Sequence, residues 1–248
     1  MSNLEGKIAL VTGGTGGIGA AICVNLAAAG AKVATNYRNK EKAEAWQKEV
    51  KAQGYDIMIY QADVSDYDAC EAMIKQVEAD LGPIDILVNN AGITKDGMFK
   101  KMTKDKWDAV MKINVDSLFN VTRHVVEGMS ERGWGRIINI ASVNGQKGQM
   151  GQTNYTTSKA GMHGFTKSLA QEVARKGVTV NTVSPGYIAT EMVMAVPEDI
   201  RNQIIAGIPV NRLGKSEEIA ALVGFLCSEE AGFATGADFS MNGGQHMS

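Results

Sequence analysis

The sequence has few cysteines and histidines, and both shortages narrow the class of protein. Its three cysteines, Cys23, Cys70 and Cys227, lie far apart. An odd and scattered set argues against a disulfide framework or a structural zinc site. The three histidines form no His-x-x-x-His pair. We therefore expect no bound metal.

Long hydrophobic runs are also missing. No stretch approaches the roughly 18 apolar residues of a membrane span, and the first residues contain no apolar signal-peptide core. The 25 Lys and Arg nearly balance the 27 Asp and Glu, which argues against a general electrostatic nucleic-acid binder. We expect a soluble, cytoplasmic protein with neither a membrane nor a nucleic acid among its partners.

Proline is rare, at 4 residues, and short β-branched runs alternate with longer helical patterns. Residues 86–88 are apolar on both faces, which is typical of parallel strands covered by helices on two sides. The alternation predicts one α/β domain, 1–248, with a doubly wound parallel sheet. The expected strands are 8–12, 32–36, 57–61, 84–89, 136–140, 179–184 and 237–240, and the expected helices are 18–29, 41–53, 69–81, 106–132, 155–176 and 217–227.

Residues 189–214 fit the alternation least well. They follow the carboxyl end of a strand, which is where open α/β sheets bind ligands. We therefore predict that this segment is a substrate lid.

Glycine is abundant, at 28 of 248 residues, and it concentrates where the first strand meets the first helix. Residues 12–19 read Thr-Gly-Gly-Thr-Gly-Gly-Ile-Gly. Glycines at such a turn let the backbone approach a pyrophosphate, and the helix N-terminus offers free N–H groups to it. The pattern favours a dinucleotide site over a tight turn without a ligand.

The end of the second strand favours NADPH. An NAD-binding unit usually carries an acid about 20 residues after the loop, whereas residues 36–40 read Asn-Tyr-Arg-Asn-Lys. A guanidinium such as that of Arg38 matches a 2′-phosphate in geometry and charge. The alternative is that Arg38 and Lys40 only solvate a helix start. Asp63 could contact the adenine or cap the helix near Ser65.

Three further residues predict acid catalysis. Tyr155 and Lys159 are four apart, so on a helix they face the same way, and Ser142 follows the strand 136–140. A phenol with a pKa of about 10 is a poor acid at neutral pH, and a nearby ammonium lowers that pKa. When a carbonyl is reduced, Tyr155 and Ser142 can meet the charge that develops on its oxygen.

With these residues, the sequence resembles the short-chain dehydrogenase/reductase family over essentially its whole length. The resemblance implies a Rossmann-type fold of seven parallel strands and usually a tetramer. The matching motifs are Thr12-Gly13-x-x-x-Gly17-Ile18-Gly19, Asn89-Asn90-Ala91-Gly92, Asn114, Ser142, Tyr155-x-x-x-Lys159 and Pro185-Gly186.

The resemblance also implies residue roles. Tyr155 is the general acid, Lys159 lowers its pKa and holds the nicotinamide ribose, and Ser142 hydrogen-bonds the developing alkoxide. Asn114 holds a water in the proton relay or stabilises a helix kink. The implied NADP contacts are Gly13, Thr15, Gly16, Gly17, Ile18, Gly19, Arg38, Asp63, Val64, Asn90, Ala91, Gly92, Tyr155, Lys159, Pro185, Gly186 and Ile188.

A narrower resemblance points to the bacterial acetoacetyl-CoA reductases, which make (R)-3-hydroxybutyryl-CoA for polyhydroxyalkanoate synthesis. It rests on residues 90–96, 133–137, 142–155 and 242–247. The loop 142–155 could also be an ordinary polar loop. The implied acyl-CoA contacts are Asp96, Ser142, Gln149, Gln152, Tyr155, Gly186 and Tyr187.

Two other functions remain open. The 3-oxoacyl-[acyl-carrier-protein] reductases of fatty-acid synthesis share the core motifs, but they often carry a base where this chain has Gln171. An acidic carrier protein needs a basic docking surface. A non-catalytic NADP-binding scaffold is the other, because fold does not fix function.

Overall fold

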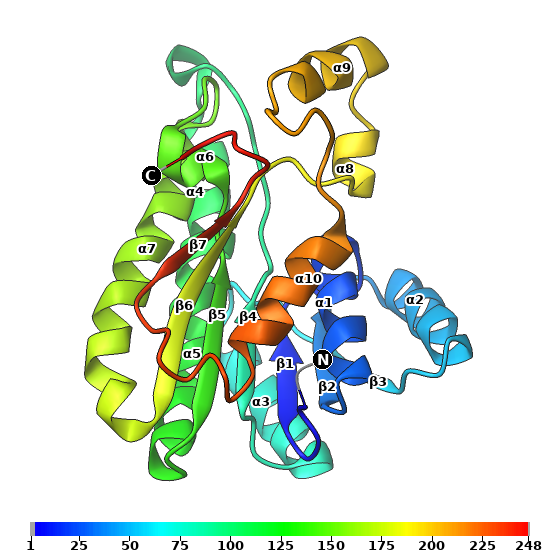
Figure 1. Ribbon diagram of the computed structural model, residues 1–248, viewed down its shortest axis with the longest axis vertical. Helices are drawn as coiled ribbons and strands as arrows, with labels where there is room; N and C mark the ends of the chain where they lie inside the picture. The colour runs from blue at the N-terminus through cyan, green and yellow to red at the C-terminus, as the bar shows by residue number, and fades with distance from the viewer. Residues whose placement is uncertain (1–2, 248) are drawn as a thin grey trace.

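Seven parallel strands form the centre of the molecule, and helices cover both faces of the sheet (Figure 1). The computed structural model describes residues 3–247. The strand order is β3-β2-β1-β4-β5-β6-β7, which confirms the predicted doubly wound Rossmann-type sheet. The strands are β1 (Ile8–Val11), β2 (Lys32–Tyr37), β3 (Ile57–Gln61), β4 (Ile86–Asn89), β5 (Gly135–Ile140), β6 (Val178–Pro185) and β7 (Asp238–Met241).

Ten α-helices are found within residues 3–247. Within the same range, the helices are too short or too polar to cross a membrane. The helices are α1 (Gly17–Ala28), α2 (Lys40–Ala52), α3 (Tyr67–Leu81), α4 (Lys104–Met111), α5 (Ser117–Glu131), α6 (Val143–Lys147), α7 (Thr153–Val173), α8 (Glu191–Met194), α9 (Glu198–Ala206) and α10 (Ser216–Leu226).

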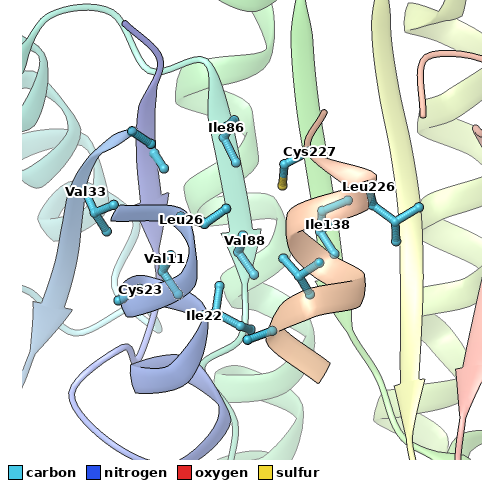
Figure 2. Close-up of a cluster of buried hydrophobic side chains, with 14 of the residues drawn as sticks. Val11, Ile22, Cys23, Leu26, Val33, Ile86, Val88, Ile138, Leu226 and Cys227 are labelled. Carbon is cyan, nitrogen blue, oxygen red and sulfur yellow. The ribbon is translucent and has the colours of Figure 1, made fainter. Parts of the chain in front are cut away.

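The hydrophobic core has two halves because the central strands β1, β4 and β5 bury apolar side chains on both faces. On one face, α1 and α10 pack against the strands, and Ile22, Leu26 and Leu226 meet Val88 and Ile138 (Figure 2). On the other face, α3, α5 and α7 cover the sheet. Burying both faces is what the continuous apolar runs of parallel strands require.

The sequence predicted one helix over 106–132, and this is wrong in detail. The chain forms α4, then a π-helical turn at Lys112–Asp116, then α5. A π-turn inserts an extra residue into a helix and is frequent at functional sites. The short helices α6, α8 and α9 were also missed, because four to nine residues give too little periodicity to identify a helix.

A chain of buried polar side chains crosses the sheet under α5 and α7. Asn89 donates to Thr122 (3.1 Å) and to Asn139 (2.9 Å). Asn139 donates to Thr166 (2.8 Å), whose hydroxyl lies 2.7 Å from that of Thr182. These groups come from β4, β5, β6, α5 and α7, and buried polar groups must be paired. The chain therefore fixes how both helices sit on the sheet.

Candidate active site

A pocket of about 890 Å³ opens at the carboxyl ends of the strands. It lies where β1 and β4 are neighbours and the strand order reverses, which is the usual ligand position in such sheets. Most of the predicted contacts line it, namely Gly13, Thr15, Gly16, Gly17, Ile18, Gly19, Arg38, Asp63, Val64, Asn90, Ala91, Gly92, Asp96, Ser142, Gln152, Tyr155, Gly186, Tyr187 and Ile188.

The glycine loop after β1 is shaped for close backbone approach. Gly13 has φ +64, which favours glycine, and a Cβ there would lie 3.1 Å from Ala91 Cα. At Gly19 a Cβ would lie 2.5 Å from the Gly13 carbonyl oxygen. The loop leads into α1 at Gly16, and the free N–H groups of a first helical turn attract anions. The loop therefore fits the pyrophosphate of a dinucleotide.

Two side chains of β2 hold this loop, and the sequence analysis missed both. Thr35 Oγ1 accepts a hydrogen bond from the Gly14 N–H (2.8 Å), and Asn36 Oδ1 accepts one from the Gly13 N–H (2.9 Å). Both residues are buried in the middle of the sheet. A pair of polar residues inside an otherwise apolar strand was the signal that could have found them.

The loop after β4 is tied to the glycine loop. Thr12 Oγ1 accepts from the N–H groups of Asn90 and Ala91, each at 3.0 Å. The Asn90 amide donates to the carbonyls of Thr12 (2.9 Å) and Gly13 (3.1 Å). Residues 90–92 thus form one wall of the pocket, as the motif predicted.

Arg38 and Asp63 both line the pocket, and the charge of Arg38 acts on the Asp63 carboxyl. Burial raises the pKa of Asp63, but hydrogen bonds from Ser65 and the charge of Arg38 bring the net shift below the ordinary value. Asp63 accepts from the Ser65 N–H (2.9 Å) and hydroxyl (2.8 Å). The cap of α3 is Asp66, which accepts from the Ala69 N–H. Of the two roles considered for Asp63, helix capping is therefore wrong.

Of the three catalytic candidates, Ser142 and Tyr155 line the pocket, and Lys159 lies next to Tyr155. Ser142 follows β5 and caps α6, where its hydroxyl accepts from the Asn144 N–H at 3.1 Å. Tyr155 lies in the first turn of α7, and Lys159 lies one turn later. The Lys159 Nζ is 5.7 Å from the centroid of the Tyr155 ring. The spacing of four residues therefore brings phenol and ammonium to one side of α7.

Lys159 is buried at the base of the site. Its residue is 3% exposed, and its Nζ donates to the Ile140 carbonyl at 2.7 Å. A Cβ on Gly92 would lie 3.5 Å from this nitrogen and 3.3 Å from Asn114 Oδ1, so the backbone after β4 passes close to both side chains. Burial lowers the pKa of Lys159 to about 7. The protonated and neutral forms of Lys159 are therefore both populated near neutral pH.

The pKa of Tyr155 is raised, opposite to the lowering that the sequence predicted. Burial raises it most, the Ser142 hydroxyl lowers it, and the charge of Asp96 raises it further. Removing water from the phenolate outweighs the stabilising contacts. The tyrosine therefore keeps its proton at neutral pH, as an acid must before it can donate.

Asn114 lies in the π-turn and is fully buried. Its Oδ1 accepts from the Ile93 N–H (2.9 Å), and its Nδ2 donates to the Ile93 carbonyl (3.1 Å) and the Ser158 hydroxyl (3.0 Å). The side chain therefore joins the loop after β4 to α7. This geometry supports the helix-kink role, while the water-holding role stays a prediction.

Two of the proposed substrate contacts form a polar pair at the mouth of the pocket. Gln152 donates to Asp96 (2.9 Å) and accepts from the Asn144 amide (3.0 Å). Gln149 does not line the pocket. Its side chain is exposed, and its Oε1 accepts a hydrogen bond from Lys147 Nζ at 3.4 Å. The expected contact of Gln149 with a bound acyl-CoA is therefore not supported by its position.

The segment after β6 is held by the C-terminal loop. The Gly186 N–H donates to the Met241 carbonyl (3.0 Å), and the Tyr187 N–H donates to Gln245 Oε1 (3.1 Å). Pro185 is buried in β6 and does not line the pocket. The residues of this segment that follow it, Gly186 and Tyr187, do line the pocket. Gln245 is a further residue that the sequence analysis missed.

The site combines an anion-binding glycine loop with the protonated phenol of Tyr155, the hydroxyl of Ser142 and the buried amine of Lys159. The loop and the Arg38 side fit an adenine dinucleotide. The phenol and the Ser142 hydroxyl can both donate to one oxygen, which is the arrangement that stabilises a developing alkoxide.

The buried ammonium generates a prediction about stability. The folded chain releases the Lys159 proton near pH 7, whereas an unfolded lysine keeps it to about pH 10.4. The unfolded state binds more protons in this window, so stability should rise with pH there, by up to about 1.4 kcal/mol per pH unit. Lys159→Met should remove this contribution, as measured by urea unfolding of the cofactor-free protein.

The matched control is Lys176→Met, which changes an exposed lysine after α7 and should leave the slope unchanged. Equal slopes for the wild type and Lys159→Met would show that Lys159 is not desolvated as the structure indicates.

Comparison with known proteins agrees with this chemistry. The family model for short chain dehydrogenases matches residues 7–201. The acetoacetyl-CoA reductases of Shinella zoogloeoides and Cupriavidus necator are 59% identical over 240 residues and 57% over 242, covering 96% and 97% of this chain and 98% of each relative. The 3-oxoacyl-[acyl-carrier-protein] reductase of Escherichia coli is 44% identical over 245 residues, 99% of each chain. These matches confirm the family resemblance, and the chain belongs to the short-chain dehydrogenases, an oxidoreductase family that works with nicotinamide cofactors.

Proposed function

We propose that the protein reduces the 3-oxo group of acetoacetyl-CoA with NADPH and forms (R)-3-hydroxybutyryl-CoA, a precursor of polyhydroxyalkanoate. The observation that carries the proposal is one pocket lined by Tyr155, Ser142 and the hydrogen-bonded Asp96–Gln152 pair. Amide and carboxylate groups beside the acid suit a thioester and a pantetheine amide. The relatives named acetoacetyl-CoA reductase cover nearly the whole chain.

The residues of the site would divide the work as follows. A bound nicotinamide supplies the hydride to the carbonyl carbon. Tyr155 donates its phenolic proton to the carbonyl oxygen, and the Ser142 hydroxyl hydrogen-bonds the same oxygen while it gains charge. Lys159, when protonated, stabilises the phenolate that remains. One hydride and one proton together convert the ketone into an alcohol.

Residues 189–214 are the proposed lid over the acyl chain. The backbone pairs Ala189 with Gly214 (2.8 Å), so the two ends of the segment are fixed side by side. All residues of α8 and α9 are at least partly exposed, and Met192 is 63% exposed although it lines the pocket. Adaptable side chains such as methionine suit an irregular acyl surface. Closure of the segment would exclude water from the reaction.

The test of the substrate is a steady-state comparison of acetoacetyl-CoA with acetoacetyl carrier protein. We expect kcat/KM to be higher for the CoA thioester, because Gln171 leaves no base at the position where carrier-protein enzymes often have one. A kcat/KM at least about tenfold higher for the carrier-protein thioester, a difference of about 1.4 kcal/mol, would move the assignment to fatty-acid synthesis.

Tyr155→Phe separates an enzyme from a non-catalytic NADP-binding scaffold. The change removes the transferable proton, so kcat and kcat/KM should fall together by about 10²–10⁴-fold. The Kd for NADPH, measured by fluorescence, should remain near that of the wild type. Retention of more than about a tenth of the activity would contradict the general-acid role.

We also propose that Arg38 selects NADPH over NADH. Arg38 lines the pocket beside Asp63, and losing a cation paired with a phosphate costs about 1.5–3 kcal/mol. Arg38→Asp should weaken NADPH binding by about 10- to 150-fold and leave NADH binding equal or better, as measured by titration. Lys40→Asp makes the same charge change at a residue paired with Glu44 and should have little effect. Equal use of both cofactors by the wild type would refute the proposal.

We propose that the enzyme acts in the cytoplasm as a homotetramer. Large apolar side chains are exposed at Phe119 on α5, Phe225 on α10 and Phe233, and closed assemblies of two-fold symmetry commonly bury such surfaces. Sedimentation of a single 26.4 kDa chain at micromolar concentration would contradict the tetramer.

A further inference from the structure

The carboxylate of Asp238, in the edge strand β7, joins several elements behind the active site. Its Oδ2 accepts from Gln146 Nε2 of α6 at 2.6 Å, and its Oδ1 accepts from the Ser184 hydroxyl of β6 at 2.7 Å. The Nδ1 of His163 on α7 lies 3.5 Å from Oδ2. Gln146 Nε2 also donates to the Ser240 hydroxyl at 2.6 Å.

Each element that meets Asp238 carries part of the active site (Figure 1). The helix α6 begins at its cap, Ser142. The helix α7 carries Tyr155 and Lys159. The strand β6 ends just before Gly186, which lines the pocket. The Asp238 carboxylate, which lies outside the pocket, therefore contacts the helices α6 and α7 and the strand β6, and these elements carry the proposed reacting groups.

The close packing of α6 on α7 leaves little room for either helix to move. A Cβ on Gly145 would lie 2.9 Å from the Lys159 Cβ, so the two helices are in direct backbone contact beside the buried amine. Gln146, the next residue, is the side chain that Asp238 holds. A shift of α6 would therefore displace Ser142 and press on Lys159 at the same time.

The chemistry of the side chains determines which group donates and which accepts in the hydrogen bonds around Asp238. A carboxylate can only accept, so the Gln146 amide must turn its nitrogen toward Asp238. The hydroxyls of Ser184 and Ser240 can donate or accept. Burial lowers the pKa of His163 although the Asp238 charge opposes this, so the imidazole is a neutral polar neighbour at neutral pH.

We propose that Asp238 is a positioning residue, which holds α6, α7 and β6 at one spacing and thereby fixes Ser142 relative to Tyr155. The inference rests on the proposed reduction of a 3-oxoacyl thioester at this site. Asp238 lies outside the pocket lining and acts through Gln146 and Ser184.

The test exchanges the two ends of the Gln146–Asp238 bond. Gln146→Glu places two carboxylates together, and we expect kcat to fall about 10- to 100-fold, because a misplacement of about 1 Å can reduce a rate 10²-fold. In the double variant Gln146→Glu, Asp238→Asn the new amide donates to the new carboxylate. Ser184 can still donate to the side-chain oxygen at position 238, and the Ser240 hydroxyl, which accepts from Gln146 in the wild type, can donate to Glu at position 146 instead. This variant should recover kcat to within about threefold of the wild type, as expected for directly coupled residues.

Two further readouts separate positioning from general loss of structure. Deuterium uptake by residues 141–150 should rise in Gln146→Glu and return to the wild-type level in the double variant. The Kd for NADPH should stay within about threefold of the wild type throughout, because the glycine loop and Arg38 are remote from Asp238 and distant sites act independently. If Gln146→Glu does not fold, Gln146→Ala removes the same bond without adding a charge.

The matched control is Asp85→Asn, a carboxylate of similar exposure that accepts from the Ile8 N–H at the opposite end of the sheet. It should lower Tm without changing kcat at a temperature where all variants are folded. The inference is overturned if kcat follows Tm in the same way in both sets, or if the double variant is no better than Gln146→Glu. A wild type inactive on acetoacetyl-CoA would refute the proposed function instead, and the exchange would then be measured with the carrier-protein thioester.

Discussion

The burial of the Lys159 ammonium is the constraint on which the rest of the site depends. In the described part of the chain, no carboxylate pairs with this charge, and its hydrogen bond goes to the Ile140 carbonyl at the end of β5. Such burial is costly for a charged group, and it lowers the pKa of Lys159 to about 7.

The sheet makes this arrangement possible. Parallel strands end at one edge, so the residues that follow β1, β4, β5 and β6 meet there although the sequence separates them widely. The polar chain from Asn89 to Thr182 then seats α5 and α7 on the strands. Because each of its donors is paired inside the core, a different seating of α7 would leave buried polar groups unpaired, at about 1–3 kcal/mol for each. The same interactions that hold the fold therefore hold Tyr155 and Lys159.

The sequence could predict what depends on local spacing. The glycine loop, the Tyr155–Lys159 interval and the apolar strands are signals within a few residues, and the sheet follows from their alternation. The sequence could not predict contacts between segments that lie far apart along the chain. Thr35 and Asn36 matter because they meet Gly13 and Gly14. Their polarity inside a buried strand marks them as paired, but it does not say that their partners lie in the glycine loop. Gln149 shows the converse, because a glutamine close to the site in sequence is exposed and lies outside the pocket lining.

The two pKa shifts at the site have one cause, which is the removal of water from both groups. Burial raises the pKa of Tyr155 and lowers that of Lys159, because both shifts disfavour a charged form in a dry site. A neutral phenol beside an amine that is readily protonated is the state from which a proton passes to a carbonyl oxygen. Burial thus keeps Tyr155 in the protonated form that a general acid needs. In the proposed reduction, a protonated Lys159 would stabilise the phenolate that remains once the proton has left Tyr155.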